Sequence, residues 1–394
     1  MVKLLMLITS LAGGGAERVA SELSLNLSPN IQRRIVTLTN EISYPSNMPP
    51  LSMNFNLKDA GVIKMVYATL MGVIRYKEIS KSYKPDVSIS FLVLDNFINV
   101  LSNIGNKKTK VIVSVHIALS MKFRKSIIDM FAKFLIKILY NKADLVIAVS
   151  EGVRKELEQV FNINPEKIRL LYNPLDIEKI QHLAKEEVND EWFDGEIPLL
   201  INMGRLAEQK GHWHLIRAFS NVNERKQCRL VIRGNGELKP YLEKLVRDLD
   251  LSNDVSFLGW QDNPFKYISK ASIFVSSSLW EALPCALIES MACGCPVIAT
   301  DCKYGPSEIL ENGKFGILTP PLDGKFYEAS DSLTPEEEYL ANEISKFLED
   351  QNIRKIYSEK GKKRAKSFDK SKSMRAYQNM IEKIVKPSID NYDK

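Results

Sequence analysis

Two glutamates, Glu281 and Glu289, stand eight positions apart where a polar loop leads into an apolar helix. A carboxylate among the Leu, Ile, Met and Ala side chains of this helix is costly to bury unless it is paired. Ribose or sugar hydroxyls could pair with Glu289, and a salt bridge within the protein is the competing explanation. Pro284 has no N–H to offer, so the free backbone donors of this turn belong to Ala282, Leu283, Cys285 and Ala286.

A second set of groups suited to an anion lies in the segment GRLAEQKG at 204–211. It follows an expected strand, and open parallel sheets bind ligands at the carboxyl ends of their strands. Arg205 can bind phosphate oxygens through two parallel hydrogen bonds, and Lys210 can act as a point charge. Fixed cations here would stabilise the charge that develops when a nucleoside diphosphate leaves. On these residues alone, a solvated pair of loop cations remains the alternative.

Two weaker signals lie in the first half of the chain. The glycines at 13–15 separate a strand from a helix, where backbone N–H groups and the helix dipole favour phosphate. They do not form a dinucleotide-binding fingerprint, so a plain tight turn is an equal alternative. His116 ends the run Val-Ile-Val-Ser-Val at the carboxyl edge of an expected strand. Taken singly, a histidine in this place is more often structural than functional.

Short apolar runs alternate with longer amphipathic ones, which is typical of βα units with parallel sheets. We expect strands at 3–9, 34–39, 86–91, 110–115, 144–149 and 168–172, and then at 197–203, 229–233, 255–258, 272–276 and 296–300. Helices are expected near 213–221, 238–249 and 286–292, and Thr334-Pro335 followed by three glutamates predicts another helix start. The acidic, non-periodic segment 182–196 marks the domain boundary. This predicts Rossmann-like domains at 1–185 and 192–370, and a final helix at 371–394 that could pack back on the first domain.

The segment from Glu281 to Glu289, with its continuation MACGCPVIATD, resembles the signature of the retaining family 4 glycosyltransferases. In that family two glutamates are likewise eight positions apart. GGGAER after the first strand, Asn173-Pro174, GRLAEQKG and RGNGEL match the same family, so the resemblance spans about residues 1–315. It implies the GT-B fold, in which two Rossmann-like domains face each other across a deep cleft.

The resemblance also implies roles for single residues. Arg205 and Lys210 would hold the donor diphosphate, and Glu289 would bind the ribose hydroxyls. Glu281 and His116 would be the catalytic residues that contact and position the donor sugar.

Further donor contacts would come from Gly14, Gly15 and the loop N–H groups after Glu281. Many relatives have glycine in place of Ala282, which predicts a slightly different loop geometry beside the donor sugar. Retention of the anomeric configuration and independence of metal ions are implied in the same way. No carboxylate is obviously placed as a nucleophile, which favours front-side attack with the leaving diphosphate accepting the acceptor proton.

The first half of the chain is basic. Nine lysines and arginines lie from Lys107 to Lys142, with Asp129 as the single acid between them, which indicates an anionic partner. Segment 121–140 combines an aromatic and aliphatic stripe with a basic one, as an interfacial membrane helix does. Its membrane-facing cations would be Lys122, Arg124, Lys125, Lys133 and Lys137. A helix packed on the sheet with ordinary solvated lysines is the alternative.

Together these features predict transfer of a hexose or N-acetylhexosamine from a UDP-sugar to a hydroxyl of a glycolipid or polyprenyl-diphosphate saccharide. The expected setting is the cytoplasm, at the anionic inner face of the cell membrane, because no membrane-spanning run or signal peptide is apparent. We expect no cofactor, no metal and no nucleic-acid partner; the five cysteines have neither a disulfide nor a zinc pattern.

Three other functions are alternatives to this hypothesis. A nonhydrolysing sugar-nucleotide epimerase would share the architecture and is the main alternative. A nicotinamide dehydrogenase would require a fuller glycine pattern and an acid about 20 residues later. A nucleic-acid-binding protein would explain the basic charge but not the two glutamates.

Overall fold

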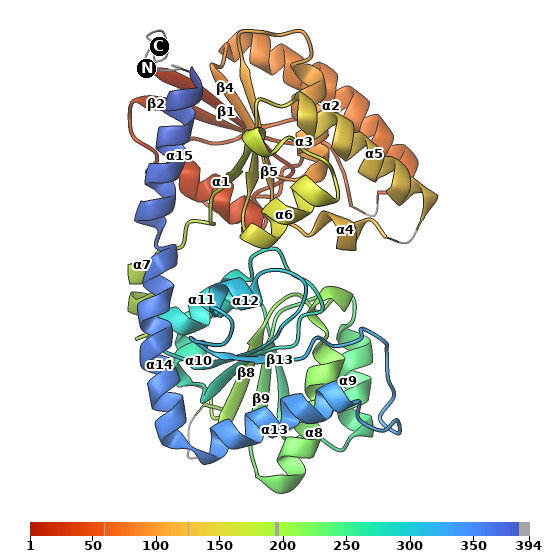
Figure 1. The fold of residues 1–394 in the computed structure, drawn as a ribbon, viewed down its shortest axis with the longest axis vertical. Helices are drawn as coiled ribbons and strands as arrows, with labels where there is room; N and C mark the ends of the chain where they lie inside the picture. Colours follow the sequence, from red (N-terminus) through yellow and green to blue (C-terminus); the bar gives the residue numbers. More distant parts are fainter. Residues whose placement is uncertain (59, 125, 194–196, 386–394) are drawn as a thin grey trace. The chain divides into compact units, whose positions relative to one another are not determined.

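The computed structural model describes residues 1–58, 60–124, 126–193 and 197–385, and the chain divides into two compact units (Figure 1). Unit 1 comprises Met1–Pro174 and the described residues from Lys370 on, and unit 2 comprises Leu175–Asp369. The boundary expected near 185–192 is therefore about ten residues too late. Helix α7 (Ile177–Leu183) buries Ile177 and Ile180 and packs against α10 and α11 of unit 2, so these residues belong to the second unit.

Seven parallel strands form the sheet of unit 1, in the order β3-β2-β1-β4-β5-β6-β7. They are β1 (Val2–Ile8), β2 (Ile31–Thr37), β3 (Leu51–Ser52), β4 (Val87–Ser90), β5 (Lys110–Val115), β6 (Leu145–Ala148) and β7 (Ile168–Leu170). All six strands expected in this half are confirmed; β3 was not expected because only two residues join the edge. The strand order reverses between β1 and β4, which is where open α/β sheets bind ligands.

The helices of unit 1 are α1 (Gly15–Asn26), α2 (Val62–Tyr83), α3 (Val93–Ser102), α4 (Leu119–Lys122), α5 (Ile127–Lys142), α6 (Glu151–Gln159) and α15 (Lys370–Val385). Successive residues of β1 face opposite sides of the sheet. Leu4 and Met6 pack in one cluster with α1 and α15, whereas Leu5 and Leu7 pack in another with α2 and α3. Figure 1 shows these two helix layers on either side of the sheet.

The amphipathic helix expected at 121–140 is two helices. Helix α4 ends at Lys122, and Ser126 begins α5 with a capping box, in which its hydroxyl accepts from the Asp129 N–H and the Asp129 side chain accepts from the Ser126 N–H. This cap favours a new helix start over a continuous helix, because it satisfies backbone donors that would otherwise lack partners. The periodicity alone did not show the break.

Six parallel strands form the sheet of unit 2, in the order β10-β9-β8-β11-β12-β13. They are β8 (Leu199–Met203), β9 (Arg229–Arg233), β10 (Val255–Gly259), β11 (Ile273–Ser276), β12 (Val297–Thr300) and β13 (Ile317–Thr319). The five strands expected here are confirmed, and β13 adds an unexpected edge. The order reverses between β8 and β11, so the segments that follow these two strands are neighbours.

The remaining helices of unit 2 are α8 (His212–Arg225), α9 (Lys239–Asp248), α10 (Phe265–Lys270), α11 (Cys285–Ala292), α12 (Pro306–Ile309), α13 (Pro335–Glu349) and α14 (Gln351–Ala365). The predicted start at Thr334 is confirmed: Thr334 and Glu337 form a capping box. Among the described residues, no helix is long and apolar enough to span a membrane, and no group of His, Cys, Asp and Glu side chains is arranged to hold a metal ion.

Candidate functional site

The loops after β8 and β11 are joined by a partly buried ion pair. The Nζ of Lys210 lies 2.5 Å from Oε1 of Glu281, and only 7% of the Glu281 side chain is exposed. The Ser278 hydroxyl donates to the same oxygen at 2.7 Å, and Gln209 Nε2 donates to Oε2 at 3.2 Å. Three donors therefore hold the carboxylate in place. The structure thus brings together Lys210 and Glu281, each expected to contact the donor, as partners of each other.

Arg205 lies two residues beyond the end of β8 and is exposed. Its guanidinium has no hydrogen bond or ion pair with any described residue, so its charge is open to an anion. The backbone around it is fixed: the Leu206 N–H donates to the Asn235 carbonyl at 2.9 Å. A Cβ on Gly234 would collide with the Gly204 carbonyl, and one on Gly236 with Leu206. The RGNGEL motif thus supplies the glycines that let the segments after β8 and β9 pack together.

The turn into α11 presents backbone donors. The N–H groups of Ala282, Leu283 and Ala286 donate to no acceptor in the described part of the chain. Ala282 does not adopt a left-handed conformation, so the alanine that replaces the glycine of many relatives fits without backbone strain. Glu289 follows on α11 and is buried, with 6% of its surface exposed. Backbone donors, a cation and two carboxylates are thus gathered in unit 2 on the segments after β8 and β11.

The glycine turn of unit 1 is less open than expected. Gly13 has a left-handed backbone with φ of 91°, and Gly14 caps the N-terminus of α1. The Glu17 carboxylate lies over Gly14, where a Cβ would meet it, and burial raises the pKa of Glu17. An anionic ligand at Gly14 and Gly15 would have to displace this acid, so their donor contact stays a prediction.

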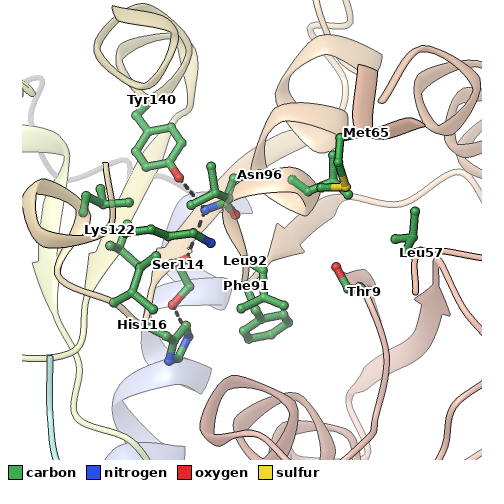
Figure 2. A pocket seen from close by; sticks show the side chains of 15 residues that line it. Thr9, Leu57, Met65, Phe91, Leu92, Asn96, Ser114, His116, Lys122 and Tyr140 are labelled. Carbon is green, nitrogen blue, oxygen red and sulfur yellow. Dashed lines mark hydrogen bonds between the residues drawn. The ribbon is translucent and has the colours of Figure 1, made fainter. Parts of the chain in front are cut away.

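His116 lies just beyond β5, at a pocket of about 240 Å³ within unit 1 (Figure 2). Ser114 Oγ is 2.9 Å from its Nε2. Burial lowers the pKa of His116 to about 4, although a hydrogen bond with Asn173 opposes that effect. The imidazole is therefore neutral near pH 7, and it can orient a hydroxyl but not supply a positive charge. Its position at the carboxyl edge of the sheet agrees with the sequence prediction.

The pocket beside His116 is lined mainly by apolar side chains. Phe91 and Leu92 come from the segment after β4 (Figure 2). Met65 lies on α2, and Leu57 lies in the segment that precedes this helix. Lys122 on α4 points into it rather than lying with the lysines of α5. The polar groups at its wall are held in place, since Asn96 Nδ2 donates to the Ser114 carbonyl at 3.2 Å and to the Tyr140 hydroxyl at 2.9 Å.

Asp95 is a buried acid that the sequence prediction missed. It lies on α3 and accepts hydrogen bonds from the Thr9 N–H at 2.9 Å and the Thr9 hydroxyl at 2.7 Å. Burial raises the pKa of Asp95 to about 8. It thereby ties α3 to the segment that leads from β1 to the glycine turn. The signal was available, because Asp95 is a lone acid in an apolar helix, as Glu289 is.

Two helices of unit 1 expose apolar faces to solvent. On α5 the exposed large apolar side chains are Ile127, Ile128, Met130, Phe131, Phe134 and Ile138. On α2 they are Val62, Ile63, Val66, Tyr67, Leu70 and Ile74. Both helices pack against α3 through other residues (Figure 1).

The predicted membrane-facing cations differ in their exposure and in the segment on which they lie. Lys137 is exposed and Lys133 half-buried on α5, Arg124 is exposed just before that helix, and Lys125 lies outside the described residues. The sequence prediction recognised the α5 stripe but overlooked α2, because the α2 segment carries few contrasting charges.

Comparison with known proteins gives matches along most of the chain. The family model described as Glycosyltransferase Family 4 matches residues 13–179, and the model described as Glycosyl transferases group 1 matches residues 184–364. The N-acetylgalactosamine-N,N'-diacetylbacillosaminyl-diphospho-undecaprenol 4-alpha-N-acetylgalactosaminyltransferase of Campylobacter jejuni is 32% identical over 382 residues, which are 95% of this chain and 98% of that protein.

Two solved structures share the fold. Sucrose-phosphate synthase of Thermosynechococcus elongatus has a TM-score of 0.80 at 18% identity, over 98% of this chain and 100% of that one. Anabaena HepE in complex with UDP has a TM-score of 0.74 at 19% identity, over 97% of this chain and 100% of that one.

Proposed function

Because the chain belongs to the family 4 glycosyltransferases, with their GT-B fold, we propose that it transfers a hexose or N-acetylhexosamine from a UDP-sugar to a lipid-linked saccharide. The Campylobacter relative is named for a diphospho-undecaprenol acceptor, and HepE was crystallised with UDP. The single observation that carries the donor assignment is that Arg205, which has no side-chain partner among the described residues, lies on the same segment after β8 as Lys210 of the Lys210–Glu281 pair.

Each group of unit 2 has a distinct task in this proposal. Arg205 binds the diphosphate with its forked donors, and Lys210 adds charge where the leaving group becomes more negative. The N–H groups of Ala282, Leu283, Cys285 and Ala286 reach the phosphate or the donor sugar. Glu289 accepts hydrogen bonds from the ribose hydroxyls.

Glu281 accepts hydrogen bonds from the donor sugar, because three protein donors hold its carboxylate in one orientation. The neutral His116 orients a sugar hydroxyl, and Gly14 and Gly15 contact the donor from unit 1. The reaction retains the anomeric configuration and needs no metal ion. Attack occurs on the face that the diphosphate leaves, and the diphosphate takes the proton of the acceptor hydroxyl.

The exposed apolar faces of α2 and α5 support a membrane-bound acceptor. Exposed large side chains on neighbouring helices favour burial in a bilayer, at about 25 cal/mol per Å² of apolar surface removed from water. Lys133, Lys137 and Arg124 would attract anionic headgroups, at about 1 kcal/mol each near the surface. We assign these two helices to the inner face of the cell membrane.

The donor assignment is tested by binding and turnover. A panel of nucleoside diphosphates and their sugars is screened for a rise in melting temperature, since a ligand that binds only the folded state stabilises it. UDP should raise the melting temperature of the wild type but not of Arg205→Ala. Arg247→Ala, which removes an exposed arginine on α9, is the control. Failure of every nucleotide to shift the wild-type melt would overturn the assignment.

The membrane assignment is tested by vesicle flotation with and without anionic lipid. Ile63→Glu and Leu70→Glu on α2, and Phe131→Glu on α5, should each leave the vesicles. Ile356→Glu, at an exposed position on α14, should float like the wild type. Equal recovery of all variants would rule out both helices as the contact.

Incubating the UDP-sugar without an acceptor distinguishes the proposed transferase from the alternative epimerase. A transferase leaves the donor sugar unchanged or slowly hydrolyses it. Formation of an epimer would identify the alternative activity.

A further inference from the structure

A continuous line of buried hydrogen bonds runs through unit 1 from helix α2 to helix α5. It begins at Tyr76 on α2, whose hydroxyl lies 2.6 Å from Oγ of Ser88 on β4. The Ser88 hydroxyl donates to the side-chain oxygen of Asn99 on α3 at 2.6 Å. The Asn99 amide donates in turn to Oγ of Ser90 on β4 at 3.0 Å. These four side chains are fully buried, so the protein itself must satisfy their polar groups.

The second half of the line ends at the pocket beside His116. The Ser90 hydroxyl donates to the side-chain oxygen of Asn96 on α3 at 2.7 Å. The Asn96 amide donates to the hydroxyl oxygen of Tyr140 on α5 at 2.9 Å. Asn96 and Tyr140 both line the pocket, and Figure 2 shows the bond between them.

Backbone carbonyls fix the direction in which this line donates. Nδ2 of Asn99 also donates to the Ser88 and Ile112 carbonyls, at 3.3 and 3.2 Å. Nδ2 of Asn96 donates to the Ser114 carbonyl at 3.2 Å. A carbonyl oxygen can only accept, so the nitrogen of each side-chain amide must face it, and neither amide can be turned round. Each group in the line therefore accepts from the neighbour on the α2 side and donates toward α5.

The Tyr140 hydroxyl at the end of the line has a proton without an acceptor. Its oxygen already accepts from Asn96, and no described residue accepts the proton. Because Tyr140 is fully buried, bulk water does not accept it either. A buried donor without an acceptor costs free energy, so an acceptor atom of a bound molecule is the expected partner. The line thus presents one donor at the pocket wall.

The rest of the lining restricts what that molecule can be. The Lys122 amine points into the pocket, and an ammonium group only donates (Figure 2). Phe91, Leu92 and Met65 present apolar surface. The lining therefore fits a group that accepts hydrogen bonds and also has an apolar part. An acetamido group has both, a carbonyl oxygen and a methyl group, whereas a sugar hydroxyl in its place would bury less apolar surface.

We propose that this pocket binds the acetamido group of the acceptor's terminal sugar, with the Tyr140 hydroxyl donating to the carbonyl oxygen. This inference rests on the proposed transfer to a lipid-linked saccharide. The acceptor is favoured over the donor because Met65 on α2 and Tyr140 on α5 both line the pocket. These two helices are the ones assigned to the membrane that carries the acceptor, whereas the groups assigned to the nucleotide lie in unit 2.

The preference between two acceptors tests the site. The two lipid-linked saccharides differ only in whether one carbon of the terminal sugar carries an acetamido group or a hydroxyl. The wild type should prefer the acetamido acceptor about tenfold to two-hundredfold in kcat/KM, the range for a methyl-sized group in an apolar pocket. Tyr140→Phe should lower this ratio about fivefold to tenfold, as the loss of one hydrogen bond predicts. A ratio of two rates does not change when part of the enzyme is merely unfolded.

Tyr76→Phe is the matched control, because it removes the hydroxyl at the other end of the same line. It disturbs Ser88 as Tyr140→Phe disturbs Asn96, but Tyr76 lies outside the described lining of the pocket. The acceptor ratio of Tyr76→Phe should equal that of the wild type, whatever stability the variant loses. Equal rates of the wild type on the two acceptors, or the same fall of the ratio in both variants, would overturn the proposal.

The same comparison with two donors separates the possible sources of an acetamido group. The donors are a UDP-N-acetylhexosamine and the matching UDP-hexose, each with both acceptors. Tyr140→Phe should leave the preference between these donors unchanged. A change in the donor preference with an unchanged acceptor preference would overturn the assignment to the acceptor.

Binding without turnover separates this site from the proposed function. In saturation-transfer NMR of an N-acetylhexosamine methyl glycoside, the acetyl methyl should receive the most saturation, and Tyr140→Phe should weaken this transfer. Sugar transfer without any preference between the acceptors would overturn this site and leave the proposed function standing. Acetyl binding that depends on Tyr140, with no transfer from any sugar nucleotide, would overturn the proposed function and leave the acetamido site standing.

Discussion

Lys210 and Glu281 are 71 residues apart in the chain and form a partly buried ion pair at 2.5 Å. The pair links the segment after β8 to the segment after β11, at the reversal of strand order. It also means that the charge of Lys210 is partly balanced before any diphosphate arrives. The proposed site therefore depends on how Glu281 divides its hydrogen bonds between the protein and the donor sugar.

Replacing Glu281 by glutamine should separate binding from turnover. Glu281→Gln keeps the size of the side chain but leaves the charge of Lys210 unbalanced. We expect kcat to fall about a hundredfold, because a positioned charged acceptor is lost, while UDP binds as tightly as before or more tightly. Steady-state turnover and calorimetric titration with UDP measure the two effects. Glu349→Gln, at an exposed position, is the control, and an unchanged kcat in Glu281→Gln would contradict the assignment.

Gly211 should tolerate no side chain. Its φ is 56°, and a Cβ would collide with the carbonyl oxygen of Ser277. Gly211→Ala should lower the free energy of unfolding by about 1 to 3 kcal/mol and weaken UDP binding, because the segments after β8 and β11 must move apart. Urea denaturation gives the stability. Gly61→Ala, where a Cβ would meet nothing within 4 Å, should unfold like the wild type.

Asp95 should make stability fall as pH rises. Its folded-state pKa of about 8 lies above the ordinary value of 3.8, because burial disfavours the charged form. Between about pH 4 and pH 8 the unfolded state has lost this proton and the folded state keeps it, so stability drops by at most about 1.4 kcal/mol per pH unit. Unfolding curves across this range should flatten for Asp95→Asn. Identical pH slopes for the two proteins would show that Asp95 is ionised in the fold.

The fully buried Glu337 should be essential to unit 2. Burial alone would raise its pKa, but hydrogen bonds from His214, Arg217 and Thr334 hold the pKa of this carboxyl below its ordinary value. Glu337→Ala leaves the guanidinium of Arg217 buried without its carboxylate and should cost about 3 to 5 kcal/mol. Chemical denaturation measures the loss. Glu338→Ala, the next residue on α13, should have little effect, and equal stability of both variants would contradict the prediction.

The sequence alone determined the parts of this protein that local chemistry controls. Alternating apolar and amphipathic runs located eleven of the thirteen strands in the described residues, because burial on both faces of a parallel sheet demands continuous apolar residues. The cap at Thr334 was equally local, since its partners lie within one helical turn. Arg205, Glu281 and Glu289 were chosen as candidate site residues because charges in glycine-rich or apolar surroundings need a special reason to be there.

Tertiary structure decided whatever depends on partners distant in the chain. The Lys210–Glu281 pair joins segments 71 residues apart, and no pattern within either segment specifies it. The exposure of the apolar face of α2 likewise could not be predicted from the sequence, because an apolar helix is expected to be buried until its neighbours are known. Periodicity records which side of an element is apolar, whereas only packing decides what, if anything, covers that side.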